Sequence, residues 1–371
     1  MKWFGEQSGL YCLNRGWKFI EQDFSVLPKE RTHSAVYGYA KAGSAGGPAS
    51  SLFDDGDWAE VTLPHDWVAA KDFAQDAPLN FGYKHRGIGW YRMKFCLERE
   101  DADKQIGILF EGLSAEAQIY CNGLLVKRNF SGYNSFFVDI SDMVHFGAVP
   151  NLLAVRIDAS AWEGWWYEGA GIYRNVWLYK KEPVHIAYNG VWVNPVSLGE
   201  KQWKVPVTVT VENSGRHLQQ YELETRLFDP EGKQVACERT AATVKGHGRK
   251  ESALEFCVKQ PQLWDLDTPR LYAVETSVLC QGQQQDTVRT QFGFREIRMD
   301  ADTGFWLNGK NLKLKGFCNH QDHAGVGAAV PYAIKEYRMK LLKHVMNIEK
   351  CFRMHLINYK KQEKIREVSR H

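Results

Sequence analysis

A cluster of polar side chains near the end of the sequence holds the residue types best suited to chemistry. Asn319, His320 and Asp322 follow a predicted strand at residues 312–316, and a helical pattern begins near residue 332. A (β/α)8 barrel keeps its chemistry at the carboxyl ends of its strands, which is where these three side chains would lie. About fifty residues follow His320, whereas such a barrel needs roughly 200 to close. The sequence therefore predicts the first β/α unit of an incomplete (β/α)8 barrel.

The side chains in this cluster suit hydrogen bonding to hydroxyl groups. An amide donates and accepts, a carboxylate accepts, and an imidazole does either according to its protonation. A metal site at His320, Asp322 and His323 is the weaker hypothesis, because adjacent loop residues rarely converge on one ion without further ligands. The structural alternative is a polar loop that fastens the first β/α turn to its neighbours. The sequence predicts neither a metal nor a cofactor.

Composition places the chain among globular proteins and excludes several functions. With 371 residues and 44% hydrophobic content, it can form two or three packed domains. The net charge is +3, and lysine and arginine are interspersed with acidic residues, so the basic patch of a nucleic-acid-binding protein is missing. No apolar run reaches the roughly 18 residues of a membrane span. We therefore expect neither nucleic acid nor a membrane as a partner.

The cysteines and the N-terminal residues predict the cellular compartment of the protein. The eight cysteines include no C-x-x-C pair, and they are Cys12, Cys96, Cys121, Cys237, Cys257, Cys280, Cys318 and Cys351. Such scattered residues are expected to be mostly buried free thiols in a reducing compartment. The first residues lack the apolar core of a secretory signal. The protein is therefore predicted to be cytoplasmic, or periplasmic or secreted if a leader was removed.

Short alternating strands and turn signals dominate the chain up to about residue 182. In the clearest unit, residues 117–127, alternating residues flank Asn122 and Gly123. An Asn-Gly pair accepts the positive φ angles of a type I′ hairpin turn. Further strands are predicted at residues 89–95, 106–110, 152–157 and 175–179. Many short strands joined by turns are typical of a sandwich or jelly roll.

A second unit begins around Pro183 and has a clear period of two. Between Val205 and Val211 every second residue is valine, and the residues between them are Pro206, Thr208 and Thr210. The pattern continues through residues 223–228 and 271–278, which is typical of an immunoglobulin-like sandwich. A hairpin with an Asn-Gly turn at residues 308–309 follows, and residues 332–343 change to a helical period.

Five motifs, in order along the chain, resemble those of glycoside hydrolase family 2, which includes β-galactosidases, β-glucuronidases and β-mannosidases. They are residues 63–67, 89–92, 169–178, 292–295 and 315–323. The resemblance covers nearly the whole chain and is closest to the β-galactosidase branch around residues 319–330. It implies a mainly β chain, with a jelly-roll sugar-binding-type domain at residues 1–182, an immunoglobulin-like domain at 183–298 and the truncated start of a catalytic barrel at 299–371.

The activity that this resemblance implies is retaining hydrolysis of O-glycosyl bonds by two glutamates. One protonates the leaving oxygen and the other attacks the anomeric carbon, so the two carboxyl groups must lie about 5 Å apart. In the family they lie on middle and late barrel strands, which would fall beyond His371. We therefore expect both glutamates to be absent, no catalytic residue in this chain, and no activity of the chain alone.

The sequence departs from the family near His344, after which no family motif is found. Residues 345–371 contain neither glycine nor proline and are rich in lysine and arginine, which predicts an exposed helix or a disordered tail. We expect a truncated or frame-shifted gene, or a remainder that is encoded separately. An opened barrel leaves the edges of its first β/α unit uncovered, so self-association is also expected.

Four residues are predicted to bind sugar on the strength of this resemblance. His320 stands where family members place a histidine that touches the sugar and stabilises charge in the transition state. Asn319 and Asp322 could hydrogen-bond hydroxyls or orient the imidazole ring. Asn175 matches an aspartate that reaches the sugar from the jelly roll, and its amide lacks the charge-assisted bond of a carboxylate. A structural bond to backbone is the alternative for Asn175.

Two other motifs are more often structural than functional. The aromatic run at residues 162–168 could stack on a sugar ring, with Glu163 or Glu168 binding hydroxyls, but large aromatic residues more often fill the core of a β domain. The motif at residues 63–67 is expected to be the end of a strand, in which His65 and Asp66 satisfy local backbone groups.

Two functions from different classes follow from the sequence. The first is the noncatalytic front part of a family 2 glycosidase, inactive alone. The second is a free-standing carbohydrate-binding or interaction module. A β-glycoside is the expected partner in both cases. The residues that separate galactoside, glucuronide and mannoside specificity lie mostly in the absent part of the barrel, so the sequence leaves the particular sugar open.

Overall fold

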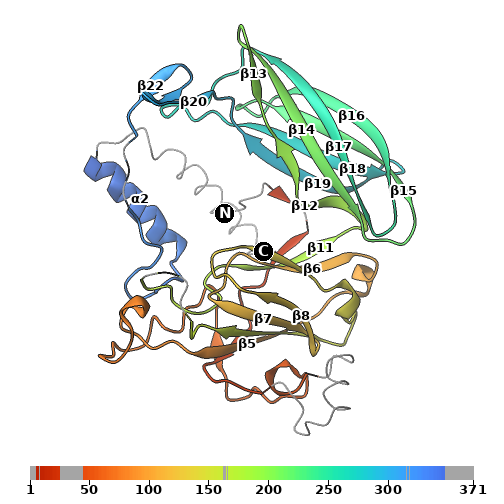
Figure 1. Cartoon of the computed structure of the whole chain (residues 1–371). Helices are drawn as coiled ribbons and strands as arrows, with labels where there is room; N and C mark the ends of the chain where they lie inside the picture. The colour runs from red at the N-terminus through yellow and green to blue at the C-terminus, as the bar shows by residue number, and fades with distance from the viewer. Residues whose placement is uncertain are drawn as a thin grey trace. The chain divides into compact units, whose positions relative to one another are not determined.

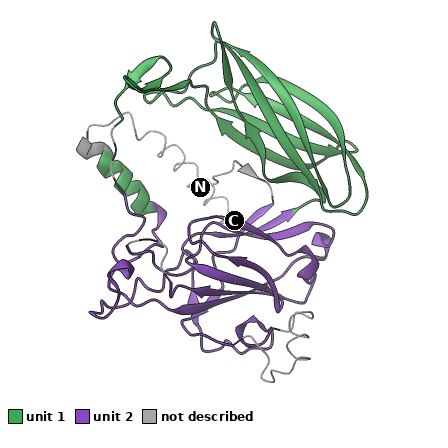
Figure 2. Ribbon diagram, in the orientation of Figure 1, with its two compact units in different colours: residues 1–8, 181–318, 333–371 green, residues 9–180, 319–332 purple. Residues whose placement is uncertain are grey.

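The computed structural model describes residues 6–7, 9–25, 45–161, 164, 166–314, 316 and 318–346. The chain divides into two compact units (Figure 1, Figure 2). Unit 2 consists of Gly9–Lys180 and Asn319–Tyr332, and unit 1 consists of Met1–Ser8, Lys181–Cys318 and Ala333–His371. Within the described residues, no helix combines the length and the hydropathy that a membrane span requires.

Unit 2 is the jelly-roll sandwich that its strand pattern predicted. Its sheets have the orders β4-β3-β5-β10-β7-β8 and β2-β11-β6-β9. The strands are β2 Leu10–Cys12, β3 Trp17–Ile20, β4 Ala59–Val61, β5 Ile88–Phe95, β6 Gln105–Phe110, β7 Glu116–Cys121, β8 Leu124–Asn129, β9 Phe136–Asp139, β10 Asn151–Asp158 and β11 Val176–Lys181. Both sheets contribute to one core, with Trp17 and Tyr91 from the larger sheet and Phe110 from the smaller one.

The central strand β5 is buried on both faces of its sheet. Tyr91 and Met93 face the sandwich core, whereas Trp90 belongs to a second apolar cluster with Trp58. Arg92 is 1% exposed, and its Nε donates to Asp55 Oδ2 at 2.7 Å. A buried guanidinium requires such a partner, since an unpaired buried charge is strongly destabilising.

The hairpin predicted at residues 117–127 is present as β7 and β8. Asn122 and Gly123 have φ angles of 49° and 84°, as a type I′ turn requires. The Asn122 side chain also donates to the Met143 carbonyl at 2.7 Å and accepts the Leu152 amide at 2.8 Å. The turn residue therefore fixes the hairpin to its neighbours as well as reversing the chain.

Unit 1 contains the predicted immunoglobulin-like sandwich. One sheet has the order β1-β19-β18-β15-β16, and the other has the order β12-β14-β13 with β17 also paired to β14. The strands are β1 Glu6–Gln7, β12 Val184–Val193, β13 Val196–Gly199, β14 Gln202–Asn213, β15 Gln219–Phe228, β16 Gln234–Val244, β17 Gly248–Lys259, β18 Tyr272–Cys280 and β19 Gln283–Phe292. The alternating valines of β14 are all fully buried, which confirms the predicted period of two.

The predicted barrel start is only partly present. A three-stranded antiparallel sheet contains β20 Ile297–Asp300, β21 Gly304–Leu307 and β22 Lys310–Leu312, and α2 follows at Tyr332–Met346. The helix and the Asn-Gly hairpin agree with the sequence. The strand expected at residues 312–316 is not seen in the described residues of this stretch: β22 ends at Leu312, and residues 313, 314 and 316 have no regular structure. The β/α unit and the three-domain division stay predictions, and most of the predicted tail lies outside the described residues.

The expectation that most cysteines are buried was wrong. Of the described cysteines only Cys121 is buried, and most of the others are exposed. Cys96 follows the buried Phe95, and Cys257 follows the buried Phe256. Because side chains alternate between the two faces of a strand, Cys257 in β17 points away from the face on which Phe256 is buried. Cys96 lies just beyond the end of β5 and is exposed there.

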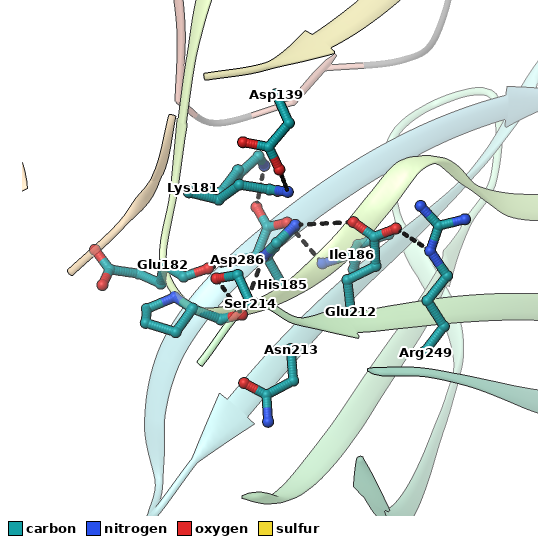
Figure 3. A network of polar contacts seen from close by, with 12 residues as sticks. Asp139, Lys181, Glu182, His185, Ile186, Glu212, Asn213, Ser214, Arg249 and Asp286 are labelled. Atoms are coloured by element: carbon teal, nitrogen blue, oxygen red, sulfur yellow. Dashed lines mark hydrogen bonds and ion pairs between the residues drawn. The ribbon is translucent and has the colours of Figure 1, made fainter. Parts of the chain in front are cut away.

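A polar network around a buried histidine joins three strands of unit 1, β12, β14 and β17 (Figure 3). His185 is 0% exposed, and its Nδ1 donates to the Glu182 carbonyl at 2.8 Å. Its Nε2 lies 3.4 Å from Oε2 of Glu212, and Arg249 pairs with the other carboxylate oxygen. The hydrogen bond from His185 holds the pKa of Glu212 below its ordinary value, with help from the Arg249 charge and against the effect of burial.

We expect Glu212→Gln to reduce the loss of unfolding free energy that unit 1 shows as the pH falls. A carboxyl group whose pKa is lowered by folding stabilises the fold above its unfolded pKa, about 4.3, and this contribution is lost as the pH falls through the folded pKa. Urea midpoints of unit 1 between about pH 6 and pH 3 should therefore fall less steeply in the variant. Glu255→Gln is the control, because Glu255 is half exposed in a surface pair with Lys204. Parallel curves for wild type and Glu212→Gln would contradict this expectation.

Candidate functional site

The Asp66 carboxylate lies where three stretches of unit 2 meet. It is 6% exposed. Its Oδ1 accepts the backbone amides of Val68 and Ala170, each at 3.0 Å. Its Oδ2 accepts the Tyr167 hydroxyl and the Ala328 amide, each at 2.8 Å. One side chain thus joins segments that are up to 262 residues apart in the sequence.

Backbone pairing explains why Asp66 is held at this point. The amides of His65 and Trp67 donate to the carbonyls of Ile172 and Ala170 at 2.9 and 3.1 Å. The ring of His65 lies against Phe19 and its Nδ1 is 2.7 Å from the Tyr91 hydroxyl. Burial lowers the pKa of His65, and the nearby Asp66 charge opposes that effect. The motif at residues 63–67 is therefore fixed on both sides by backbone and by aromatic packing.

The segment that carries the predicted site residues contains a tight loop on unit 2. His323 and Gly327 form an antiparallel bridge with two backbone hydrogen bonds of 3.0 and 2.8 Å. Ala328, the next residue, donates to Asp66. Asp322 immediately precedes the bridge. The loop geometry is therefore tied to the carboxylate of Asp66.

The predicted sugar-binding residues are accessible to different degrees. Asn319 and His320 are exposed, whereas Asp322 is half-buried. Burial raises the pKa of the Tyr167 hydroxyl, and the negative charges of Asp66 and Asp322 raise it further. The hydroxyl therefore stays protonated and available as a donor. The roles of Asn319, His320 and Asp322 toward a sugar stay predictions.

A buried ion pair lies at the end of the aromatic run. The Arg86 side chain is 0% exposed and that of Glu168 is 6% exposed. Arg86 Nη1 donates to Glu168 Oε2 at 3.2 Å, and its Nη2 donates to the Ala161 carbonyl at 3.0 Å. The guanidinium lies 3.7 Å from the centre of the Phe81 ring. Tyr133 donates its hydroxyl to Glu168 Oε1 at 2.7 Å, so both oxygens of Glu168 accept protein donors.

This arrangement favours the structural interpretation of much of the aromatic run. Tyr167 packs against the core of unit 2, and Glu168 is buried. Trp166 keeps 38% of its surface exposed. Trp162, Glu163 and Trp165 lie outside the described residues. A stacking role for the exposed part of the run stays a prediction.

Asn175 takes part in hydrogen bonds within unit 2. Its Oδ1 accepts Asn14 Nδ2 at 2.9 Å, and its Nδ2 donates to Glu111 Oε2 at 2.9 Å. Glu111 Oε1 accepts the indole of Trp177, also at 2.9 Å. The amide therefore bonds to side chains, whereas the structural alternative expected a backbone partner. Its contact with sugar stays a prediction.

For Asp66 we predicted only a local role, hydrogen bonding to nearby backbone. The bond to Val68 is such a local contact, but the bonds to Tyr167 and Ala328 are not. One signal was present, because a carboxylate inside an apolar and aromatic motif must find several donors when it is buried. No pattern in the neighbouring sequence indicated the roles of Arg86 and Tyr133. No three His, Cys, Asp or Glu side chains of the described residues are grouped as metal ligands.

Two family models match the chain, one in each unit. The model of the glycosyl hydrolases family 2 sugar binding domain matches residues 76–182, and the model of glycosyl hydrolases family 2 matches residues 184–295. The first match contains Arg86 and the loop from Tyr167 to Ala170, and the second contains most of the strands of the immunoglobulin-like sandwich.

Curated relatives and solved structures agree with these models. A β-galactosidase of Bacteroides ovatus is 35% identical over 86% of this chain and 38% of its own length. A putative β-glucuronidase of Formosa agariphila is 30% identical over 89% of this chain and 29% of its own length. The structure of a Bacteroides uniformis β-glucuronidase matches with a TM-score of 0.78 and 28% identity, over 91% of this chain and 38% of that chain. The chain thus spans less than half the length of each.

Proposed function

The chain belongs to glycosyl hydrolase family 2, and from this premise we propose that it supplies the sugar-binding-type jelly roll and the immunoglobulin-like sandwich of a β-glycosidase. In this proposal unit 2 presents Asn319, His320 and Asp322 to the hydroxyl groups of a β-glycoside. The chain by itself binds sugar weakly and does not hydrolyse it. The observation that carries the proposal is that these three residues belong to the same unit as the match to the sugar binding domain.

The chemistry of the segment supports a carbohydrate ligand. Sugar hydroxyls need both donors and acceptors, and an amide, an imidazole and a carboxylate within four residues supply both. Exposed aromatic side chains on the same unit, Tyr133 at 50% and Trp166 at 38%, suit the apolar face of a sugar ring. A carbohydrate is therefore favoured over a charged polymer, for which the net charge of +3 gives no support.

The hydrogen bonding of the buried carboxylates supports the proposal that this chain alone does not hydrolyse sugar. Retaining hydrolysis needs one carboxyl group to give a proton to the leaving oxygen and another to attack carbon, about 5 Å apart. Asp66 accepts four protein donors, and Glu168 accepts Arg86 and Tyr133. Protein donors therefore already bind both oxygens of each carboxylate, which favours a structural role for Asp66 and Glu168 over a part in an acid and nucleophile pair.

The substrate class is proposed to be a galactoside or a glucuronide. The curated relatives reported above carry these two names. We expect isothermal titration of the chain with galactose and with glucuronate to detect one of them with a Kd near or above about 1 mM, as suits a partial site. His320→Ala should weaken that binding roughly tenfold by removing one hydrogen bond to the sugar.

Activity assays separate this function from the alternatives. Chromogenic β-galactosides and β-glucuronides should show no turnover above buffer with the chain alone. Turnover would contradict the assignment of Asp66 and Glu168 to structure. If the folded chain binds neither galactose nor glucuronate, the proposed sugar-binding role is wrong.

A further inference from the structure

We propose that Asp66 is the positioning residue for the site segment. On this proposal, which rests on the proposed function, the jelly roll uses one buried carboxylate to hold the loop at His323–Ala328 in place. Asp322 and His320 are thereby kept where a sugar can meet them. Asp66 itself does not touch the sugar.

The number of donors explains why the position needs a carboxylate. Two amides reach Oδ1, and a hydroxyl and an amide reach Oδ2. Only an ionised carboxylate offers acceptor sites on both oxygens and no donor. An asparagine would place an NH2 group against two of these donors. Among the residues that the structure describes, no lysine or arginine pairs with Asp66, so these four hydrogen bonds compensate for its burial.

Two glycines allow the loops to approach the carboxylate closely. A Cβ added at Gly169 would overlap Oδ2 of Asp66, and one added at Gly327 would overlap both that oxygen and the Tyr167 hydroxyl. Their φ angles are +69° and +56°, a region that favours glycine. Both loops therefore have the conformation and the free space that let their neighbouring amides, Ala170 and Ala328, reach Asp66.

The loop passes this constraint on to the site residues over a short path. Ala328 follows Gly327, and Gly327 is bridged to His323 by two backbone hydrogen bonds. Asp322 precedes His323, so the bridge that holds His323 also limits the positions open to Asp322. A continuous backbone route thus connects the carboxylate of Asp66 to Asp322. Loss of the Ala328 bond should free the segment without opening the sandwich core.

Two glycine substitutions in the same loop provide a matched test. Gly325 and Gly327 both have positive φ, +82° and +56°, so alanine strains the backbone at either position. Only Gly327→Ala forces a methyl group onto Asp66 and Tyr167, since a Cβ at Gly325 meets nothing within 4 Å. The two variants therefore separate backbone strain from loss of the Asp66 contact.

The measurement is hydrogen exchange of peptides that cover residues 318–332, on the full chain without sugar. Gly327→Ala and Asp66→Asn should exchange there at least about tenfold faster than wild type, while Gly325→Ala stays close to wild type. The exchange of β5 and β10 should not change in the glycine variants. Galactose or glucuronate, whichever the wild type binds, should bind Gly327→Ala about tenfold more weakly.

The two proposals fail in different ways. Equal exchange in Gly325→Ala and Gly327→Ala would overturn the positioning role, whatever the sugar result. If wild type binds neither sugar but the exchange contrast is present, the proposed function fails and the positioning role of Asp66 is kept. If Asp66→Asn does not fold, Gly327→Ala still tests the positioning role, because it disturbs the contact with Asp66 from within the loop and leaves Asp66 itself unchanged. Faster exchange with unchanged sugar affinity would show that the segment does not serve the sugar.

Discussion

Arg86→Met is expected to lower the unfolding free energy of unit 2 by about 3–5 kcal/mol, because it leaves a buried carboxylate without its cation. The partner Glu168 is 6% exposed. Methionine retains much of the apolar stem of arginine, so the loss should come mainly from charge and hydrogen bonding. Hydrogen exchange at increasing urea measures this, because the peptides of each unit report on that unit alone.

The double variant Arg86→Met with Glu168→Met tests the physical reason. Removing both charges should recover much of the lost stability, as is usual for buried pairs. The recovery will be incomplete, because Tyr133 and the Ala161 carbonyl lose their partners. If the double variant is as unstable as Arg86→Met, packing rather than the unpaired carboxylate causes the loss.

Phe294→Ala is expected to lower the unfolding free energy of unit 1 by about 3–5 kcal/mol, the usual cost of removing a buried phenylalanine. Phe294 is 0% exposed. Its ring makes edge contacts with Trp203, Tyr272 and Phe292 at centroid distances of 5.4, 4.7 and 5.2 Å. The substitution leaves a cavity among rigid aromatic rings, which close around it poorly.

Phe294→Leu is the matched control, because it keeps part of the volume and should cost clearly less. The same hydrogen-exchange experiment tests Phe294→Ala and Arg86→Met. Phe294→Ala should destabilise peptides of unit 1 and spare β5 and β10, whereas Arg86→Met should do the reverse. Equal losses in both units after either substitution would contradict the division into two compact units.

Several elements were predictable because their cause is local. The Asn122-Gly123 turn needs only two residues that accept positive φ, and β14 needs only alternating valines. The helix α2 was predicted because its period of apolar residues is itself a local property. The strand expected at residues 312–316 failed for the opposite reason, since a strand exists only where a neighbouring strand pairs with it.

The residue types of the candidate site were predictable, but the hydrogen bonds that hold its residues in place were not. Asn319, His320 and Asp322 were identified from the sequence, as was the resemblance of the surrounding motif. The hydrogen bonds that hold Asn175 to Asn14 and Glu111 were not, because the first spans 161 residues and the second 64. Exposed cysteines such as Cys257 were misjudged although the strand period would have placed them outward.

The sequence by itself determined the strand periods, the turn chemistry and the family of this protein, since each depends on residues that are close together along the chain. Only the tertiary structure decided that Asp66 meets Ala328 and that Arg86 pairs with Glu168, across 262 and 82 residues. A carboxylate or guanidinium that is buried must have hydrogen-bonding partners. The fold determines which donors and acceptors come within hydrogen-bonding distance.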